Sequence, residues 1–92
     1  MEPRHTRIEE EIETGAGILV REAYYGHPKG IPNIYLVKDG EIIWEAELPM
    51  PDDVYANQMR IEADHFRCAS WNGIDSTIAL KTGKITESLL TK

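Results

Sequence analysis

Apolar and polar residues alternate along much of the chain, with the two-residue period that is typical of β-strands. Two dipeptides, Asp39-Gly40 and Asn72-Gly73, interrupt this alternation. Asp or Asn followed by Gly tolerates the positive φ angles of a tight hairpin turn. The sequence therefore predicts two β-hairpins, whose strands are rich in Ile, Val, Tyr, Trp and Thr and cover residues 33–38, 41–48, 65–71 and 74–80.

Three further strands are predicted from the same pattern. Residues 17–25 are apolar on both faces, which indicates a strand that is central in a sheet or covered on both sides. Residues 54–63 alternate as a half-exposed strand does. A turn at Thr82-Gly83-Lys84 leads into a last strand over 85–90.

The N-terminal region admits two interpretations. Ile8 and Ile12 are four residues apart, which suits one helical turn, but Ile8, Glu10 and Ile12 also alternate as in a strand. We favour the strand, closed into a hairpin onto 17–25 by residues 14–17, because the rest of the chain is β. Residues 1–6 are expected to be frayed.

Together these segments predict an all-β fold in a single domain over residues 1–92. We expect six or seven antiparallel strands in hairpins, arranged as blade-like sheets, a small sandwich or a partial barrel. Residues 26–33 and 49–53 each contain two prolines, which cannot donate to a sheet ladder. Both stretches are therefore predicted to be loops.

The charge balance limits the classes of partner that the chain is expected to bind. The chain has 10 Lys and Arg residues against 16 Asp and Glu, a formal net charge of −6. An acidic surface repels phosphate backbones and no cluster of basic residues offsets it, so nucleic-acid binding is disfavoured. No apolar run is long enough to span a membrane. Cys68 is the single cysteine and cannot form an internal disulfide, which favours a cytoplasmic location.

The residues that commonly perform catalysis or hold metals form no recognisable motif. Cys68 and His65 are three residues apart, so on one strand they point to opposite faces and cannot form a nucleophile–base pair. The three histidines, His5, His27 and His65, are scattered with none of the spacings of a metal site. We therefore expect no catalytic residues, no metal, no cofactor and no enzymatic activity.

A weak internal repeat relates the two halves of the chain. Residues 34–44 resemble residues 78–85, and both Gly40 and Ile42 recur 43 residues later, as Gly83 and Ile85. Periods of roughly 40–50 residues with four short strands each are typical of β-propeller blades.

These residues resemble the repeats of quinoprotein-like propellers, of the pyrroloquinoline-quinone type. Blades of that family often end in a strand, a Thr-Gly-Lys or Asp-Gly-Lys turn, an apolar pair and a Trp. Trp44 stands four residues after Gly40 in this pattern, whereas the second copy keeps Thr82-Gly83-Lys84 but has Glu87 at the position of the Trp. The resemblance implies blade-like sheets. It transfers no quinone site, because the family's cofactor-binding residues lie outside this motif.

The number of blades leads to an expectation about assembly. A propeller needs at least four blades of roughly 40 residues, and the sequence accounts for about two. Two blades leave open sheet edges, which attract other strands. We therefore expect a homodimer, or binding to another protein.

The candidate binding residues are Tyr24, Tyr25, His27 and Lys29, together with Trp71. Aromatic side chains beside a Pro- and Gly-rich loop are common in recognition surfaces, because rigid rings bury area at low entropic cost. The sequence thus favours a non-enzymatic protein-interaction module. The alternative is a small-ligand-binding protein or an enzyme with a pocket between hairpins, using His27, His65 or Tyr55 as polar groups.

Overall fold

The computed structural model of the protein describes residues 2–90, which fold into eight β-strands and no helix. No helix that could cross a membrane is therefore found among them. The all-β fold is confirmed, with eight strands in place of the expected six or seven. The strands form two four-stranded antiparallel sheets, in the orders β1-β2-β3-β4 and β5-β6-β7-β8. Their bounds are β1 Ile8–Thr14, β2 Gly17–Glu22, β3 Ile34–Lys38, β4 Glu41–Glu45, β5 Arg60–Glu62, β6 His65–Ala69, β7 Ile74–Ala79 and β8 Ile85–Leu90.

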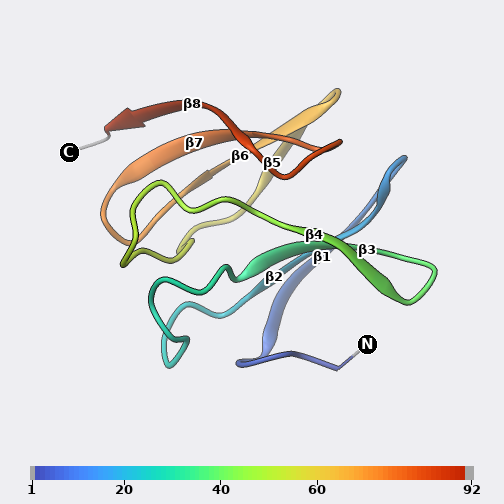
Figure 1. Cartoon of the computed structure of the whole chain (residues 1–92), viewed down its shortest axis with the longest axis horizontal. Coiled ribbons are helices and arrows are strands. Elements are labelled where there is room, and N and C mark those ends of the chain that lie inside the picture. The colour runs from blue at the N-terminus through green and yellow to red at the C-terminus, as the bar shows by residue number, and fades with distance from the viewer. Residues whose placement is uncertain (1, 91–92) are drawn as a thin grey trace.

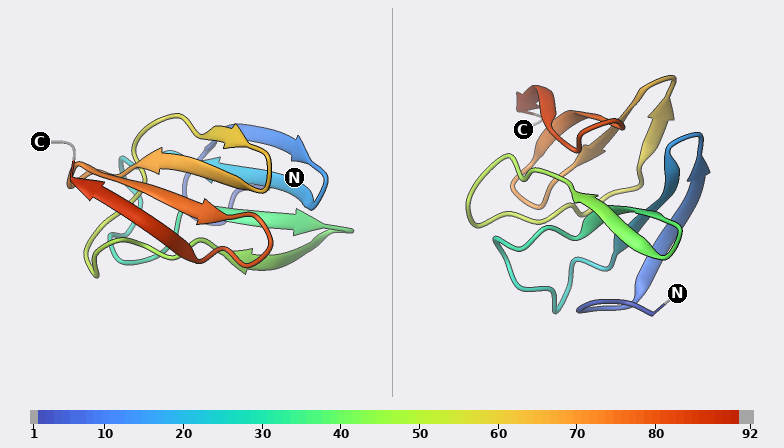
Figure 2. Two further views of the ribbon diagram at one scale, coloured as in Figure 1. Left: turned by 90° about the horizontal axis from the view of Figure 1, so that it is seen from above. Right: turned by 45° about the vertical axis from the view of Figure 1, so that its right-hand side comes forward.

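The two sheets face each other, as the views along two directions show (Figures 1 and 2). Within each sheet every strand pairs with the strand that follows it in the chain. The turns inside the hairpins β1–β2, β3–β4, β5–β6 and β7–β8 lie at one end of the molecule (Figure 1). The loops β2–β3 and β4–β5 and the β6–β7 turn lie at the other end.

The core lies between the sheets because side chains alternate along each strand. Leu19 and Leu36 point inward from the first sheet, and Phe66, Cys68 and Ile78 point inward from the second. The remaining buried members of this cluster are Ile34, Ala46, Tyr55, Met59 and Leu80. Cys68 is fully buried, and burial raises the pKa of its thiol to about 12.

The outer face of the first sheet is also covered. Val20, Tyr35 and Val37 form a second buried cluster there, with Ile8 packed against it. The N-terminal residues run across this side, away from the second sheet (Figure 1). The Arg4 guanidinium lies 5.5 Å from the centre of the Tyr35 ring. The strand predicted over 17–25, central in a sheet or covered on both sides, is confirmed for residues 17–22, which form β2; residues 23–25 lie beyond its end.

The expected fraying of residues 1–6 is wrong for residues 4–6. The backbone N–H groups of Arg4, His5 and Thr6 donate to the buried Glu22 carboxylate at 2.6, 3.0 and 3.0 Å. Met1 lies outside the described residues. The strand that was favoured over a helix for residues 7–13 is confirmed, because Ile8–Thr14 form β1.

The strand predicted over 54–63 is wrong for most of its length, because only Arg60–Glu62 form β5. The chain crosses here from one sheet to the other. Tyr55 makes a single bridge to Ser70, and its hydroxyl donates to the Glu47 carbonyl at 2.5 Å. Residues 54 and 55 are therefore buried in the core and do not run along a sheet surface.

The sequence repeat corresponds to a structural repeat. Gly40 lies between β3 and β4, and Gly83 between β7 and β8, so both occupy the hairpin of the third and fourth strands of their sheets. Trp44 joins the two units: its indole N–H donates to the Leu80 carbonyl at 2.9 Å, and its ring lies parallel to that of Phe66, 6.3 Å between centres.

Alanine substitutions at the two equivalent glycines test this junction. Both have positive φ angles, +79° for Gly40 and +74° for Gly83. A Cβ at Gly40 would meet nothing within 4 Å, but one at Gly83 would lie 2.5 Å from a ring atom of Trp44. We expect Gly40→Ala to lower the free energy of unfolding by about 1 kcal/mol, and Gly83→Ala by a further 1–3 kcal/mol or so. Urea unfolding of both variants checks this, and equal losses would contradict it.

Candidate functional site

The five residues that the sequence singled out for binding lie together. Tyr24, Tyr25, His27, Lys29 and Trp71 line one cavity of about 220 Å³, completed by Gly26 and Val54. Four of the five come from the β2–β3 loop, and Trp71 comes from the β6–β7 turn. We call this cavity the aromatic pocket. Sequence reasoning missed Val54, because the strand predicted there placed it on a sheet.

The aromatic rings of the pocket contact one another. The Tyr24 and Trp71 rings stack with centres 5.3 Å apart, and the Tyr24 and Tyr25 rings meet edge to face at 5.2 Å. The Lys29 ammonium lies 5.2 Å from the centre of the Trp71 ring. Tyr25 is 50% exposed and Trp71 51% exposed. The pocket therefore presents preformed aromatic surface, and one cation, to the solvent.

Backbone hydrogen bonds fix the two loops relative to each other. The Trp71 N–H donates to the Val54 carbonyl at 2.8 Å, and the Gly30 N–H to the Asp53 carbonyl at 3.0 Å. The buried Asp53 carboxylate also accepts the Asn72 N–H at 3.2 Å. Residues 53 and 54 thus connect the β2–β3 loop to the β6–β7 turn, which sets the walls of the pocket.

Tyr25 is also held by Arg7, the residue that precedes β1. The Arg7 guanidinium lies 5.2 Å from the centre of the Tyr25 ring and also donates to the Tyr25 hydroxyl. This contact orients the ring while leaving half of its surface exposed.

Behind the pocket, a carboxylate and two imidazoles come together. Ligand atoms of His5, Glu22 and His27 all lie within 4.8 Å of one another. Sequence reasoning missed this group because hydrogen bonds to Glu22, far along the chain, bring His5 there. The expectation of no metal-ligating residues rested on spacing, and the fold brings together residues with no characteristic spacing.

The ionisation of this group follows from its surroundings. Burial alone would raise the pKa of the Glu22 carboxyl, but the hydrogen bonds from Arg4, Tyr35, Thr6 and His5 outweigh it and lower the pKa. Burial lowers the pKa of His27, which is therefore neutral at pH 7.

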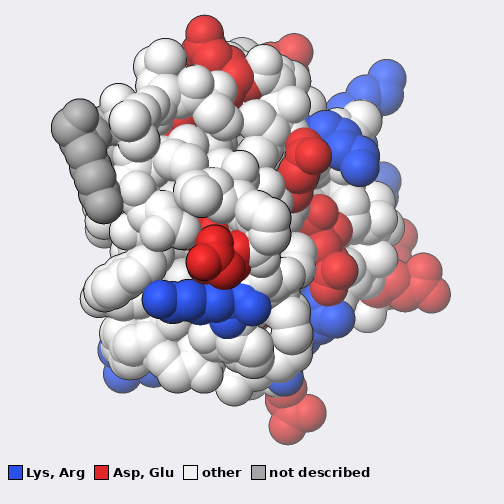
Figure 3. All heavy atoms as spheres, turned by 60° about the vertical axis from the view of Figure 1, so that its left-hand side comes forward, with Lys and Arg blue, Asp and Glu red and all other residues white. Residues whose placement is uncertain are grey.

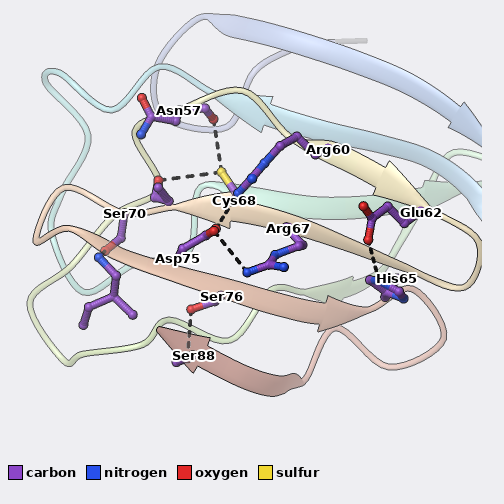
Figure 4. Close-up of polar contacts among 12 residues, drawn as sticks. Asn57, Arg60, Glu62, His65, Arg67, Cys68, Ser70, Asp75, Ser76 and Ser88 are labelled. Atoms are coloured by element: carbon purple, nitrogen blue, oxygen red, sulfur yellow. Dashed lines mark hydrogen bonds and ion pairs between the residues drawn. The ribbon is translucent and has the colours of Figure 1, made fainter. Parts of the chain in front are cut away.

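Other candidate residues lie apart from the pocket. Cys68 faces the core and His65 the outer face of the second sheet, which confirms that they cannot pair. His65 contacts Glu62 and Asp64, at 3.0 and 3.2 Å, and these contacts raise its pKa. Figure 4 shows polar contacts of the second sheet, among them the ion pairs of Asp75 with Arg60 at 2.5 Å and with Arg67 at 3.2 Å.

The loop end of the molecule carries few charges. Figure 3, which brings the left-hand side of Figure 1 forward, shows a largely uncharged surface there, interrupted near its middle by acidic side chains beside basic ones, with more charged side chains at its top and along its right-hand side. An uncharged surface at this end is suited to apolar contacts, since little charge has to be desolvated.

Low pH is expected to weaken the hydrogen bonds that hold residues 4–6 to the Glu22 carboxylate. The folded pKa of Glu22 lies below its ordinary 4.5, so its carboxylate stabilises the fold above that pH and loses this effect as pH falls. Glu22→Gln should lower the free energy of unfolding by about 2 kcal/mol at pH 7.

The difference from the original protein should then shrink as pH falls below about 4.5, because the carboxylate itself becomes protonated. Urea unfolding between pH 7 and pH 3 measures both proteins. Protonation of the buried His27 lowers the stability of both proteins as pH falls below 6.5, and it does so more in Glu22→Gln, because the Glu22 carboxylate raises the pKa of His27. The decisive comparison is therefore the one below pH 4.5, where the Glu22 carboxylate loses its charge. A difference that stays constant with pH would contradict the role of Glu22.

Comparisons with known proteins give no relative for this arrangement: no family model, no curated protein and no solved structure matches the chain.

Proposed function

We propose that the protein is a non-enzymatic interaction module that binds a partner protein through the aromatic pocket. The observation that carries this proposal is the half-exposed Trp71 ring stacked on Tyr24, with the half-exposed Tyr25 and with Lys29 beside them. Tyr and Trp dominate binding energy at protein interfaces, because they offer large rigid surfaces with few rotatable bonds.

The dimensions of the pocket favour a peptide segment over a metabolite. Its volume of about 220 Å³ lies below the roughly 300–1,000 Å³ of small-molecule sites. Proline-containing segments in an extended conformation dock on aromatic grooves of this kind. Lys29 adds a positive charge at the rim, so the segment we propose carries proline or other apolar residues next to an acidic residue.

The alternative function receives less support. The alternative places His27, His65 or Tyr55 as a polar group in a pocket between hairpins, and a pocket that used more than one of them would need them close together. Tyr55 is buried in the core, His65 lies on the outer face of the second sheet and His27 lies in the β2–β3 loop. The proposal of a non-enzymatic role rests on this separation and on the apolar lining of the aromatic pocket.

We also propose that the two sheets are related to blades of quinoprotein-like propellers. Both third-to-fourth-strand hairpins carry a bulge, between Leu36 and Val37 and between Thr77 and Ile78. Trp44 of the first unit packs on the Gly83 turn of the second. The proposed relation concerns only the arrangement of the strands and implies no cofactor.

Peptides selected from a random displayed library on the immobilised chain test the proposed function. We expect the selected peptides to be enriched in proline and in acidic residues. Trp71→Ala should weaken their binding about tenfold or more, because it removes a stacked anchor. Calorimetry measures the affinities, and circular dichroism checks that the variant is folded. Peptide binding that survives Trp71→Ala would overturn the proposal.

Two lysines provide a matched control for the charge. Lys29→Glu should weaken binding of the acidic peptides, whereas Lys81→Glu introduces the same change in charge on the exposed turn at the opposite end of the molecule. Equal effects of the two substitutions would indicate long-range electrostatics and would contradict a role for Lys29 at the rim of the pocket.

We further propose that the chain forms a homodimer through its exposed sheet edges. The edge strands β4 and β8 carry exposed apolar residues, among them Ile43 at 51% and Leu89 at 49%. Open edges of this kind pair readily with other strands.

Sedimentation equilibrium at micromolar concentration should give about twice the 10.5 kDa of one chain. Ile43→Lys and Leu89→Lys, each of which places a charge on an edge strand, identify the edge involved: one of them should yield the monomer. A single 10.5 kDa species of the unaltered protein would exclude the dimer.

A further inference from the structure

We propose that His5, Glu22 and His27 form a binding site for a divalent transition metal of the zinc type. One ring nitrogen from each histidine and one carboxylate oxygen lie within 4.8 Å of one another, behind the aromatic pocket. Two imidazoles and one carboxylate are a donor set that Zn²⁺ takes in open sites, in which water completes the coordination.

His27 supplies the independent evidence for a ligand. The residue is buried, with 6% of its surface exposed, and its Nε2 has no hydrogen-bond partner among residues 2–90. Its Nδ1 lies 3.1 Å from the Pro28 carbonyl oxygen, which can only accept, so Nδ1 carries the proton and donates. Nε2 therefore has a free lone pair. An imidazole whose other nitrogen donates to a backbone carbonyl is the usual arrangement of a metal-ligating histidine.

The buried position of His27 suits ligation as well. A buried ring nitrogen without a partner is unfavourable, since the group has lost its hydrogen bonds to water. A metal ion would replace those bonds.

Glu22 provides negative charge and positions His5. Its two oxygens accept hydrogen bonds from three backbone N–H groups, those of residues 4, 5 and 6, and from the Tyr35 hydroxyl at 2.5 Å. These bonds already occupy the lone pairs of the carboxylate, so a metal has to displace one donor. The two imidazoles are therefore the ligands that can bind first, and Glu22 becomes the third ligand once one of these donors is displaced.

His5 can supply the movement that the site requires. Zinc–nitrogen bonds of about 2.0 Å place tetrahedral ligand atoms roughly 3.3 Å apart, closer than the 4.8 Å limit within which these atoms lie. The side chain of His5 is exposed, and its ring centre is 5.0 Å from that of His27. Rotation of the His5 side chain closes the remaining gap without moving the backbone that Glu22 holds.

Titration of the untagged protein with Zn²⁺ at pH 7, followed by calorimetry, tests the site. We expect saturable binding of one Zn²⁺ per chain and a shift of the His27 ring nitrogens in ¹⁵N NMR spectra. His5→Ala should weaken binding about tenfold or more. It keeps the backbone N–H that donates to Glu22, so the fold is retained. His27→Gln should have a similar effect and serves as the second variant.

His65→Ala is the matched control, because His65 is also close to two carboxylates but lies on the outer face of the second sheet. Its zinc affinity should equal that of the unaltered protein. The proposal is overturned if about 50 µM protein shows no saturable binding. It is also overturned if His65→Ala weakens binding while His5→Ala and His27→Gln leave it unchanged.

Discussion

The buried side chain of Asn33 holds together the three parts of the chain on which the rest of the structure depends. Its amide nitrogen donates to the carbonyls of Glu22 at 2.9 Å and Tyr55 at 2.8 Å, and its oxygen accepts the Tyr55 N–H at 2.9 Å. These bonds join the end of β2, the start of β3 and the segment that crosses to the second sheet. A buried polar network with every member satisfied specifies one arrangement, because any other leaves polar groups without partners.

The aromatic pocket is a consequence of this network. Tyr55 is bridged to Ser70, so fixing Tyr55 also fixes the turn that bears Trp71. Tyr24 and Tyr25 follow directly after β2, whose last residue is Glu22. The rings of the two loops therefore meet without any contact to a ligand. A surface that is ordered before binding loses less conformational entropy on binding, which is the advantage of a preorganised site.

Local chemistry predicted much of the fold from the sequence, and long-range contacts account for what it missed. The hairpin at Asp39-Gly40 was predictable because both residues adopt positive φ angles, 54° and 79°, which this dipeptide tolerates. The course of residues 54 and 55 was not, because alternation of apolar residues cannot distinguish a strand from a segment that enters the core. Residues 4–6 are held in place by the Glu22 carboxylate, 16 to 18 positions along the chain, which local sequence patterns do not reveal.

The residues of the candidate site divide in the same way, into those that local sequence predicted and those that long-range contacts bring together. Tyr24, Tyr25, His27 and Lys29 are neighbours in the chain, so their composition identified them, and Trp71 was recognisable beside a turn. The group behind them was not recognisable: His5 reaches His27 only through the backbone bonds of its segment to Glu22.

The two copies of the repeat differ at Trp44, whose equivalent is Glu87. The direction in which side chains at equivalent positions point explains this difference. Val37 and Ile78 occupy equivalent places beside the two bulges, yet Val37 packs on the outer face of the first sheet and Ile78 in the core between the sheets. The side chains of Val37 and Ile78 therefore point in the same direction, from the second sheet toward the first. The two units are accordingly stacked head to tail and are not related by a two-fold axis. Trp44 accordingly points to the second sheet, where the Gly83 turn receives it. Glu87, at the equivalent position, points to the opposite side of the second sheet, where no described residue forms a third unit. A charged residue is stable there because its carboxylate stays hydrated, whereas a Trp would lie exposed.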